Sequence, residues 1–138
     1  MTALKTGMND GSLLDTHVLL WAVSAPQRLS PAVRSLIQKR AYSVSVASLW
    51  ELINKRDKDD APVKDPAAWW DRYIASVGTR VLPIRTRHVL ELQQLPWHHR
   101  DPYDRILIAQ AIVEDLPLVT ADREMERYPV RIARPWMK

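Results

Sequence analysis

Short apolar runs alternate along this chain with longer segments that carry helix signals. The predicted strands are residues 12–14, 42–44, 81–84, 118–120 and 130–132. The predicted helices are residues 18–23, 31–40, 66–77, 86–94, 102–114 and 123–127. A further predicted helix carries residues 49–53, has Ser45 or Ser48 as its cap, and runs into the charged stretch 55–60, which is a predicted solvent-exposed loop. Because strands that alternate with helices are typical of parallel sheets, the pattern predicts an α/β fold: a three-layer sandwich with a short parallel sheet flanked by helices.

Local signals support two of these helices. Ser30 followed by Pro31 has the residue types of a helix N-cap and first helical position. The apolar residues of segment 102–114 are spread around almost the whole helix circumference, which predicts a buried helix. Trp21 and Trp50 are predicted core residues.

Length and charge narrow the class of protein. A chain of 138 residues predicts one domain, here residues 12–138, after an N-terminal extension, residues 1–11, without predicted structure. The formal net charge is +4, and 14 of the 20 cationic residues are arginines, whose side chains bind phosphate oxygens well. This charge is compatible with a nucleic-acid partner but does not require one.

Several function classes are excluded by residues that are missing. The sequence has no cysteine, so thiolate catalysis and cysteine zinc sites are excluded, and its three glycines form no phosphate-binding loop. Its longest apolar run, Val18–Val23, is far below the roughly 20 residues that a membrane span needs. The first eleven residues have no apolar signal-peptide core, so we expect a cytoplasmic protein with no membrane partner.

Acidic residues occur where the predicted strands and helices meet. Asp15 ends the first strand, Asp122 follows a later one, Asp101 and Asp104 open the buried helix, and Glu51 lies in the third helix. Because the carboxyl ends of parallel strands meet at one edge of a sheet, we expect these carboxylates to cluster. Clustered carboxylates repel one another, and a hard cation such as Mg²⁺ or Mn²⁺ stabilises them.

Each acid also has a purely structural interpretation. Asp101 and Asp122 have the positions of helix N-caps, and Asp104 is a favourable charge in a first helical turn. Glu51 alone could be a surface carboxylate. Asp15 is the hardest to explain structurally, since it lies between a buried strand and an apolar helix.

In four segments that span nearly the whole chain, the sequence resembles the PIN-domain ribonucleases, and among them the VapC-type toxins of toxin–antitoxin pairs. The matching segments are residues 13–21, 45–52, 100–111 and 118–123, in the family's order. The resemblance implies a catalytic, metal-coordinating quartet, which consists of Asp15, Glu51, Asp104 and Asp122. It also implies nearby supporting or substrate-contacting residues, which are Thr16, Asp101, Thr120 and Arg123.

The resemblance further implies hydrolysis of RNA with Mg²⁺, or Mn²⁺, as cofactor and water as nucleophile. It implies an antitoxin protein and a second copy of the chain as partners. Two alternatives remain open: a catalytically silent PIN-like module that binds RNA or protein, and a phosphoryl-transfer enzyme with Asp15 as nucleophile. The second normally needs an acid two residues further on, where this chain has His17. His98 and His99 are predicted to lie in a solvent-exposed loop, and contact with the substrate is the open alternative.

Overall fold

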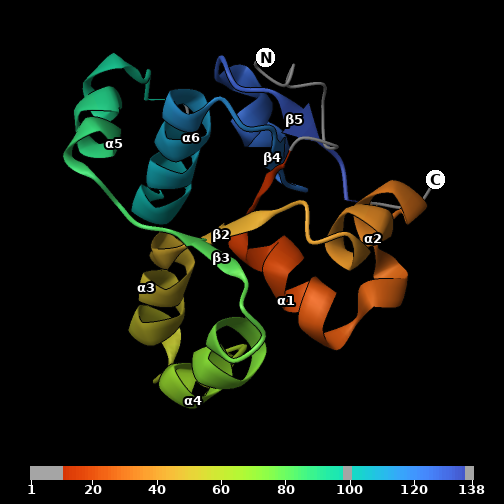
Figure 1. Ribbon diagram of the computed structural model, residues 1–138. Helices are drawn as coiled ribbons and strands as arrows, with labels where there is room; N and C mark the ends of the chain where they lie inside the picture. The colour runs from red at the N-terminus through yellow and green to blue at the C-terminus, as the bar shows by residue number, and fades with distance from the viewer. Residues whose placement is uncertain (1–10, 98–100, 136–138) are drawn as a thin grey trace.

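The computed structural model describes residues 11–97 and 101–135, and in this part of the chain five short strands form one parallel sheet (Figure 1). The strand order is β3-β2-β1-β4-β5. The strands are β1 (Leu13–Leu14), β2 (Ser43–Ser45), β3 (Arg80–Leu82), β4 (Leu118–Val119) and β5 (Ile132–Ala133). The main helices are α1 (Thr16–Ser24), α2 (Pro31–Gln38), α3 (Val46–Lys55), α4 (Pro66–Trp70), α5 (Thr86–Glu91) and α6 (Pro102–Glu114).

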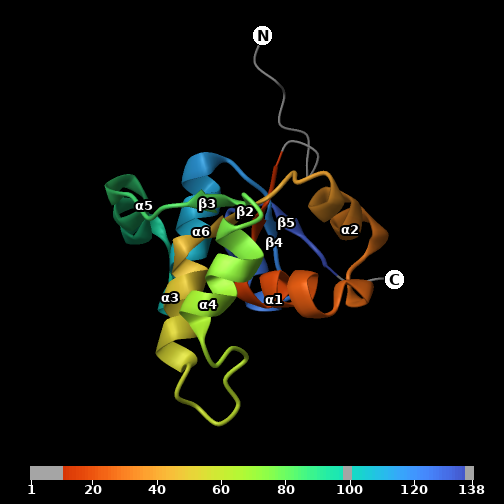
Figure 2. The same ribbon diagram turned by 60° about the horizontal axis from the view of Figure 1, so that its bottom comes forward.

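Neighbouring residues of the central strands face opposite sides of the sheet, because side chains alternate along a strand. Leu13 and Leu118 belong to a core cluster built mainly with α6, whereas Leu14 and Val119 belong to a second cluster built mainly with α1 and α2. Figure 2 shows α1 and α2 on one side of the sheet and α5 and α6 on the other. The predicted three-layer α/β sandwich is therefore confirmed.

Several predicted boundaries shift by a few residues. The helix predicted to reach residue 77 is α-helical only to Trp70 and continues as a π-helical turn, Asp71–Ala75. Residues 56–65 form the loop between α3 and α4, which projects at the bottom of Figure 2. Residues 98–100 and 1–10, which include His98, His99 and most of the predicted N-terminal extension, lie outside the described residues. None of the described helices is long and apolar enough to cross a membrane.

The prediction that Trp50 is a core residue is wrong. Its side chain is 45% exposed and packs edge-on against the ring of Tyr103, with 4.6 Å between ring centroids. The inward face of α3 instead carries Ala47, Glu51 and Leu52, and helical periodicity then places Trp50 on the flank. Trp21 is partly buried against the second core cluster.

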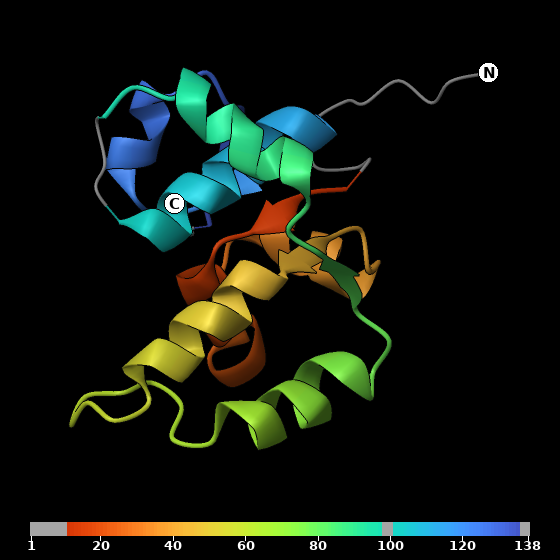
Figure 3. The same cartoon turned by 90° about the vertical axis from the view of Figure 1, so that its left-hand side faces the viewer.

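Three helical segments begin at the carboxyl ends of strands, with at most three residues between strand and helix. Asp15 alone separates β1 from α1, β2 runs into α3 through its last residue, Ser45, and the 3₁₀-helix Arg123–Arg127 follows β4. The strands are parallel, so these helix starts lie at the same edge of the sheet. In Figure 3 the starts of α1 and α6 and most of α3 face the left-hand side of the molecule.

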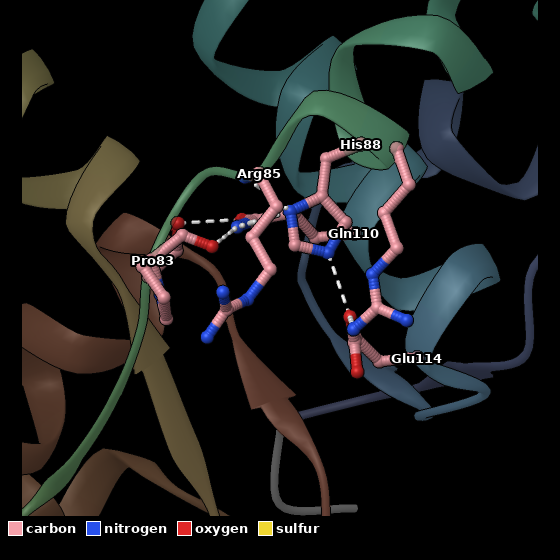
Figure 4. Close-up of polar contacts among 7 residues, drawn as sticks. Pro83, Arg85, His88, Gln110 and Glu114 are labelled. Carbon is pink, nitrogen blue, oxygen red and sulfur yellow. Dashed lines mark hydrogen bonds and ion pairs between the residues drawn. The ribbon is translucent and has the colours of Figure 1, made fainter.

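A polar network lies between α5 and α6 (Figure 4). His88 is fully buried, its Nδ1 accepts the backbone N–H of Arg85 at 2.9 Å, and its Nε2 lies 2.7 Å from Glu114 Oε2. Gln110 accepts from the Ser45 hydroxyl at 2.5 Å and donates to a backbone carbonyl in the segment before α5 at 3.1 Å. We call the side chains of Ser45, His88, Gln110 and Glu114 the His88 network.

Candidate active site

All four acids of the predicted quartet line one pocket, of about 340 Å³, at the carboxyl edge of the sheet. Asp101 lines it as well, so five carboxylates from four separate segments face the same space. We call it the acid pocket; it is lined by Asp15, His17, Trp21, Glu51, Lys55, Asp101, Asp104, Ala121 and Asp122.

Asp15 is both the N-cap of α1 and a buried member of the acid pocket. Its Oδ1 accepts the backbone N–H of Val18 at 3.1 Å, and its Oδ2 accepts the hydroxyl proton of Thr120. Burial raises the pKa of the Asp15 carboxyl, and the bonds from Thr120 and Val18 oppose that effect only in part. Thr120 also accepts the N–H of Asp122 at 3.0 Å, so one hydroxyl links two of the acids.

Glu51 is buried on the inward face of α3 and is only partly satisfied. Its Oε2 accepts from Lys55 Nζ at 2.5 Å, one helical turn further on. Its Oε1 is buried and has no hydrogen-bond partner among the described residues. A buried anionic oxygen without a donor is costly, and a bound cation would remove that cost.

Besides Asp15, two more acids of the pocket are helix caps, in the positions that the sequence indicates. Asp101 caps α6, because its Oδ1 accepts the N–H groups of Tyr103 at 2.8 Å and Asp104 at 3.1 Å. Asp122 caps the 3₁₀-helix that follows β4 by accepting the N–H of Glu124 at 2.9 Å. Asp104 lies in the first turn of α6. Capping and pocket lining are therefore compatible roles for the same carboxylates.

Of the four predicted supporting residues, Asp101 lines the acid pocket, whereas Thr16, Thr120 and Arg123 are not among its lining residues. Thr16 is buried beside Asp15, but its hydroxyl donates to the Ser48 hydroxyl at 2.9 Å, which joins α1 to α3. Arg123 is exposed and is not among the residues that line the acid pocket.

Lys55, the last residue of α3, lies in the acid pocket, where its charge opposes those of the carboxylates. Burial lowers its pKa, but the hydrogen bond and charge of Glu51, followed by the charges of Asp101 and Asp104, outweigh that effect and raise it overall. In the sequence, its spacing of four residues from Glu51 is the only sign of this ion pair.

The donor set of the acid pocket fits a hard divalent cation. Every anionic donor is a carboxylate oxygen, and one of them, Glu51 Oε1, lacks a partner among the described residues. Within residues 11–97 and 101–135, however, no group of three potential ligands is already arranged as a metal site.

Comparison with known proteins identifies the family. A family model described as PIN domain matches residues 12–131. The chain belongs to the PIN-domain family. This PIN domain is 30% identical, over 118 residues, to Ribonuclease VapC22 of Mycobacterium tuberculosis, a match that covers 84% of this chain and 90% of the relative.

Solved structures share the fold of this PIN domain. DNA-bound VapBC from Salmonella typhimurium matches with a TM-score of 0.69 and 24% identity, over 90% of this chain and 97% of the other. VapBC2 from Rickettsia felis, bound to a promoter DNA fragment, matches with a TM-score of 0.67 and 15% identity, over 91% and 98% of the two chains. VapBC-5 from Mycobacterium tuberculosis matches with a TM-score of 0.57 and 19% identity, over 92% and 98%.

Proposed function

We propose that this PIN domain is an Mg²⁺-dependent endoribonuclease and the toxin of a toxin–antitoxin pair. The observation that carries the proposal is the acid pocket, in which five carboxylates face one space and Glu51 Oε1 has no partner among the described residues. The similarity to Ribonuclease VapC22 supports RNA as the substrate.

The proposed ligands are Asp15, Glu51, Asp104 and Asp122, with Mn²⁺ as a possible substitute ion. When bound there, Mg²⁺ supplies the Lewis acidity that polarises a phosphodiester and activates water. Because the sequence has no cysteine and the pocket is built from carboxylates, we assign the nucleophilic role to water.

Residues in or beside the pocket hold the proposed ligands in place. The hydroxyl of Thr120 fixes Asp15 and receives the backbone N–H of Asp122, so the first and last acids are held together. Asp101 fixes the start of α6. Lys55 holds one oxygen of Glu51 and places a positive charge beside the space that a phosphate would enter.

The proposed partners are an antitoxin protein and a second copy of the chain, and the proposed location is the cytoplasm. The solved structures with the same fold include VapBC toxin–antitoxin complexes, which supports the antitoxin. Exposed apolar side chains are available for contacts between proteins; they include Trp50, Val81, Val89 and Leu90.

Purified protein tests the enzymatic part of the proposal. Single-stranded RNA should be cleaved with Mg²⁺, cleavage should stop with excess EDTA, and added Mg²⁺ or Mn²⁺ should restore it. Mapping the RNA ends after brief expression in cells should show cleavage at defined sites. RNA that stays intact with both metals would contradict the proposal and favour a silent binding module.

A growth experiment tests the biological part. Expression of the chain alone should arrest growth, and co-expression of its antitoxin should relieve the arrest. The matched control is the Asp104→Asn variant, which we expect to be harmless because it removes one proposed ligand. Arrest by this variant at an equal protein level would show that the toxicity does not depend on the acid pocket.

A further inference from the structure

A second pocket, of about 530 Å³, adjoins the acid pocket. His17, Trp21, Glu51 and Lys55 line both, so these four residues form a wall that the two pockets share. The second pocket extends from this shared wall along α1 towards Arg28 and the loop that follows α3. We call it the Trp21 pocket. Its volume lies in the range of small-ligand sites, roughly 300–1,000 Å³.

The Trp21 pocket differs in chemistry from the acid pocket. The guanidinium of Arg28 lies over the Trp21 ring, 4.4 Å from its centroid. Lys58 also lines the pocket, and Leu20 and Leu52 contribute apolar surface. Among the described lining residues there are two acids: Glu51, which the acid pocket shares, and Asp60, which it does not. A planar aromatic–guanidinium pair, an apolar wall and positive charge therefore lie next to a cluster of carboxylates.

This combination suits a nucleotide. Proteins bind single-stranded RNA by stacking its bases on aromatic rings and arginine planes, while cations contact the backbone. A strand whose phosphate lies in the acid pocket would bring a neighbouring base to the shared Trp21 wall. An acidic peptide could use the cations but would make no comparable use of the Trp21 ring and the guanidinium that lies over it.

We propose that the Trp21 pocket is a base-stacking subsite of an RNA substrate, formed by Trp21 and Arg28. The proposal rests on the proposed RNA cleavage in the acid pocket. It assigns Arg28 and Trp21 a role in binding a nucleotide next to the scissile phosphate, and it makes this pocket a determinant of which RNA is cleaved.

The test pairs protein variants with abasic RNA. A single-stranded RNA that the wild type cleaves is made in versions that each lack one base near the cleavage site. Removing the stacked base should raise the KM about tenfold at one position, the equivalent of a typical stacking energy, and change kcat less than twofold. Arg28→Gln should raise the KM of the intact RNA by a similar factor. For the RNA that lacks the stacked base, the same substitution should raise the KM little further.

The matched control is Arg72→Gln. Arg72 is also exposed and lies over an aromatic ring, that of Tyr73 at 5.3 Å, but it lines neither pocket. This variant should leave every KM unchanged. Trp21→Leu should act like Arg28→Gln but also removes a ring packed on the core, so its folding is checked by circular dichroism. If Trp21→Leu unfolds, Arg28→Gln still provides the test, because Arg28 is exposed and its replacement leaves the core intact.

The outcomes separate the subsite from the proposed function. If the effects of Arg28→Gln and of every abasic site on the KM are additive, the subsite is overturned, while the proposed nuclease activity still stands. Unchanged RNA kinetics with weaker binding of the antitoxin would also overturn it, because the pocket would then bind the protein partner. If the wild type cleaves no RNA, the proposed function itself fails.

Discussion

The acid pocket and the His88 network are two buried polar regions of the same fold, and they differ in how completely their polar groups are satisfied. In the network, Gln110 both donates and accepts, and both ring nitrogens of His88 have partners. In the acid pocket, one oxygen of Glu51 has no partner among the described residues, and burial raises the pKa of Asp15. A satisfied network specifies packing, whereas unsatisfied buried charge is typical of a binding or catalytic site.

Charge balance differs in the same way. In the network, Glu114 lies 2.7 Å from both Arg87 and His88, so its carboxylate has nearby donors. In the acid pocket, Lys55 is the one permanent cation among the described lining residues, against five carboxylates. The first region should therefore contribute stability without a ligand, and the second should gain it when a cation binds.

The largest expected effect is the loss of activity on removing a ligand from the acid pocket. Asp104→Asn should lower RNA cleavage by more than about 100-fold, since changes even to outer partners of metal ligands often cost 10- to 100-fold. Circular dichroism should show an intact fold. Full cleavage by this variant would remove Asp104 from the proposed quartet.

The corresponding change in the His88 network should affect stability. Gln110→Leu leaves the Ser45 hydroxyl without its acceptor and a backbone carbonyl without its donor. The free energy of unfolding in urea should fall by roughly 2–4 kcal/mol. Gln93→Leu, on an exposed position of the neighbouring 3₁₀ turn, is the control and should change it by less than about 0.5 kcal/mol. An equally small loss for Gln110→Leu would show that the network adds little stability.

Stabilisation by Mg²⁺ should depend on the acid pocket and not on the His88 network. Saturating Mg²⁺, at about 100 times its Kd, should stabilise the wild type by roughly 2.7 kcal/mol, measured by thermal unfolding against an EDTA sample. The Gln110→Leu variant should show the same gain, whereas Asp104→Asn should show little. Equal gains in all three proteins would place the bound ion outside the acid pocket.

Stability without metal should depend on pH through Asp15. Because burial raises the folded-state pKa of Asp15 above its ordinary value of 3.8, protons favour the folded chain, and its contribution falls as pH rises from about 4 through the raised pKa. In EDTA, Asp15→Asn should therefore become more stable relative to wild type over that range. Asp65→Asn, at the exposed N-cap of α4, is the control and should show no such trend. If the free energy of unfolding changes with pH in the same way for Asp15→Asn and wild type, burial does not raise the pKa of Asp15.

The smallest expected effect is that of Asp101→Asn. Asparagine keeps the side-chain oxygen that accepts the N–H groups at the start of α6, and it is an equally good N-cap. Cleavage should stay within about threefold of wild type in the assay used for Asp104→Asn, because a preserved cap costs little. A loss as deep as that of Asp104→Asn would show that Asp101 is the ligand.

Much of the fold was predictable because its signals are local. The caps Ser30, Asp101 and Asp122 bind N–H groups two or three residues further on, and the alternation of strands and helices gives the parallel sheet. The exposure of Trp50 was not predictable, since it depends on which face of α3 is turned inward. The bond from Ser45 to Gln110 joins residues 65 positions apart, for which the sequence has no local sign.

The candidate site divides in a similar way. Topology alone predicts that Asp15 and Asp122 meet at one sheet edge, and the structure brings them to one pocket. The places of Lys55, Trp21 and Arg123 depend instead on side-chain conformation at the ends of helices. The resemblance implies Arg123 near the substrate, which stays a prediction, and the structure adds Lys55 and Trp21 to the pocket wall.

Helix α6 carries both regions, with Asp104 in its first turn and Gln110 further along. Its residues Arg105–Ala111 are all buried. Amide protons in such a segment exchange with solvent only when most of the domain opens. Hydrogen exchange of α6 should therefore report the global stability of the chain. Any event that displaces the backbone around Gln110 would have to overcome nearly that whole free energy.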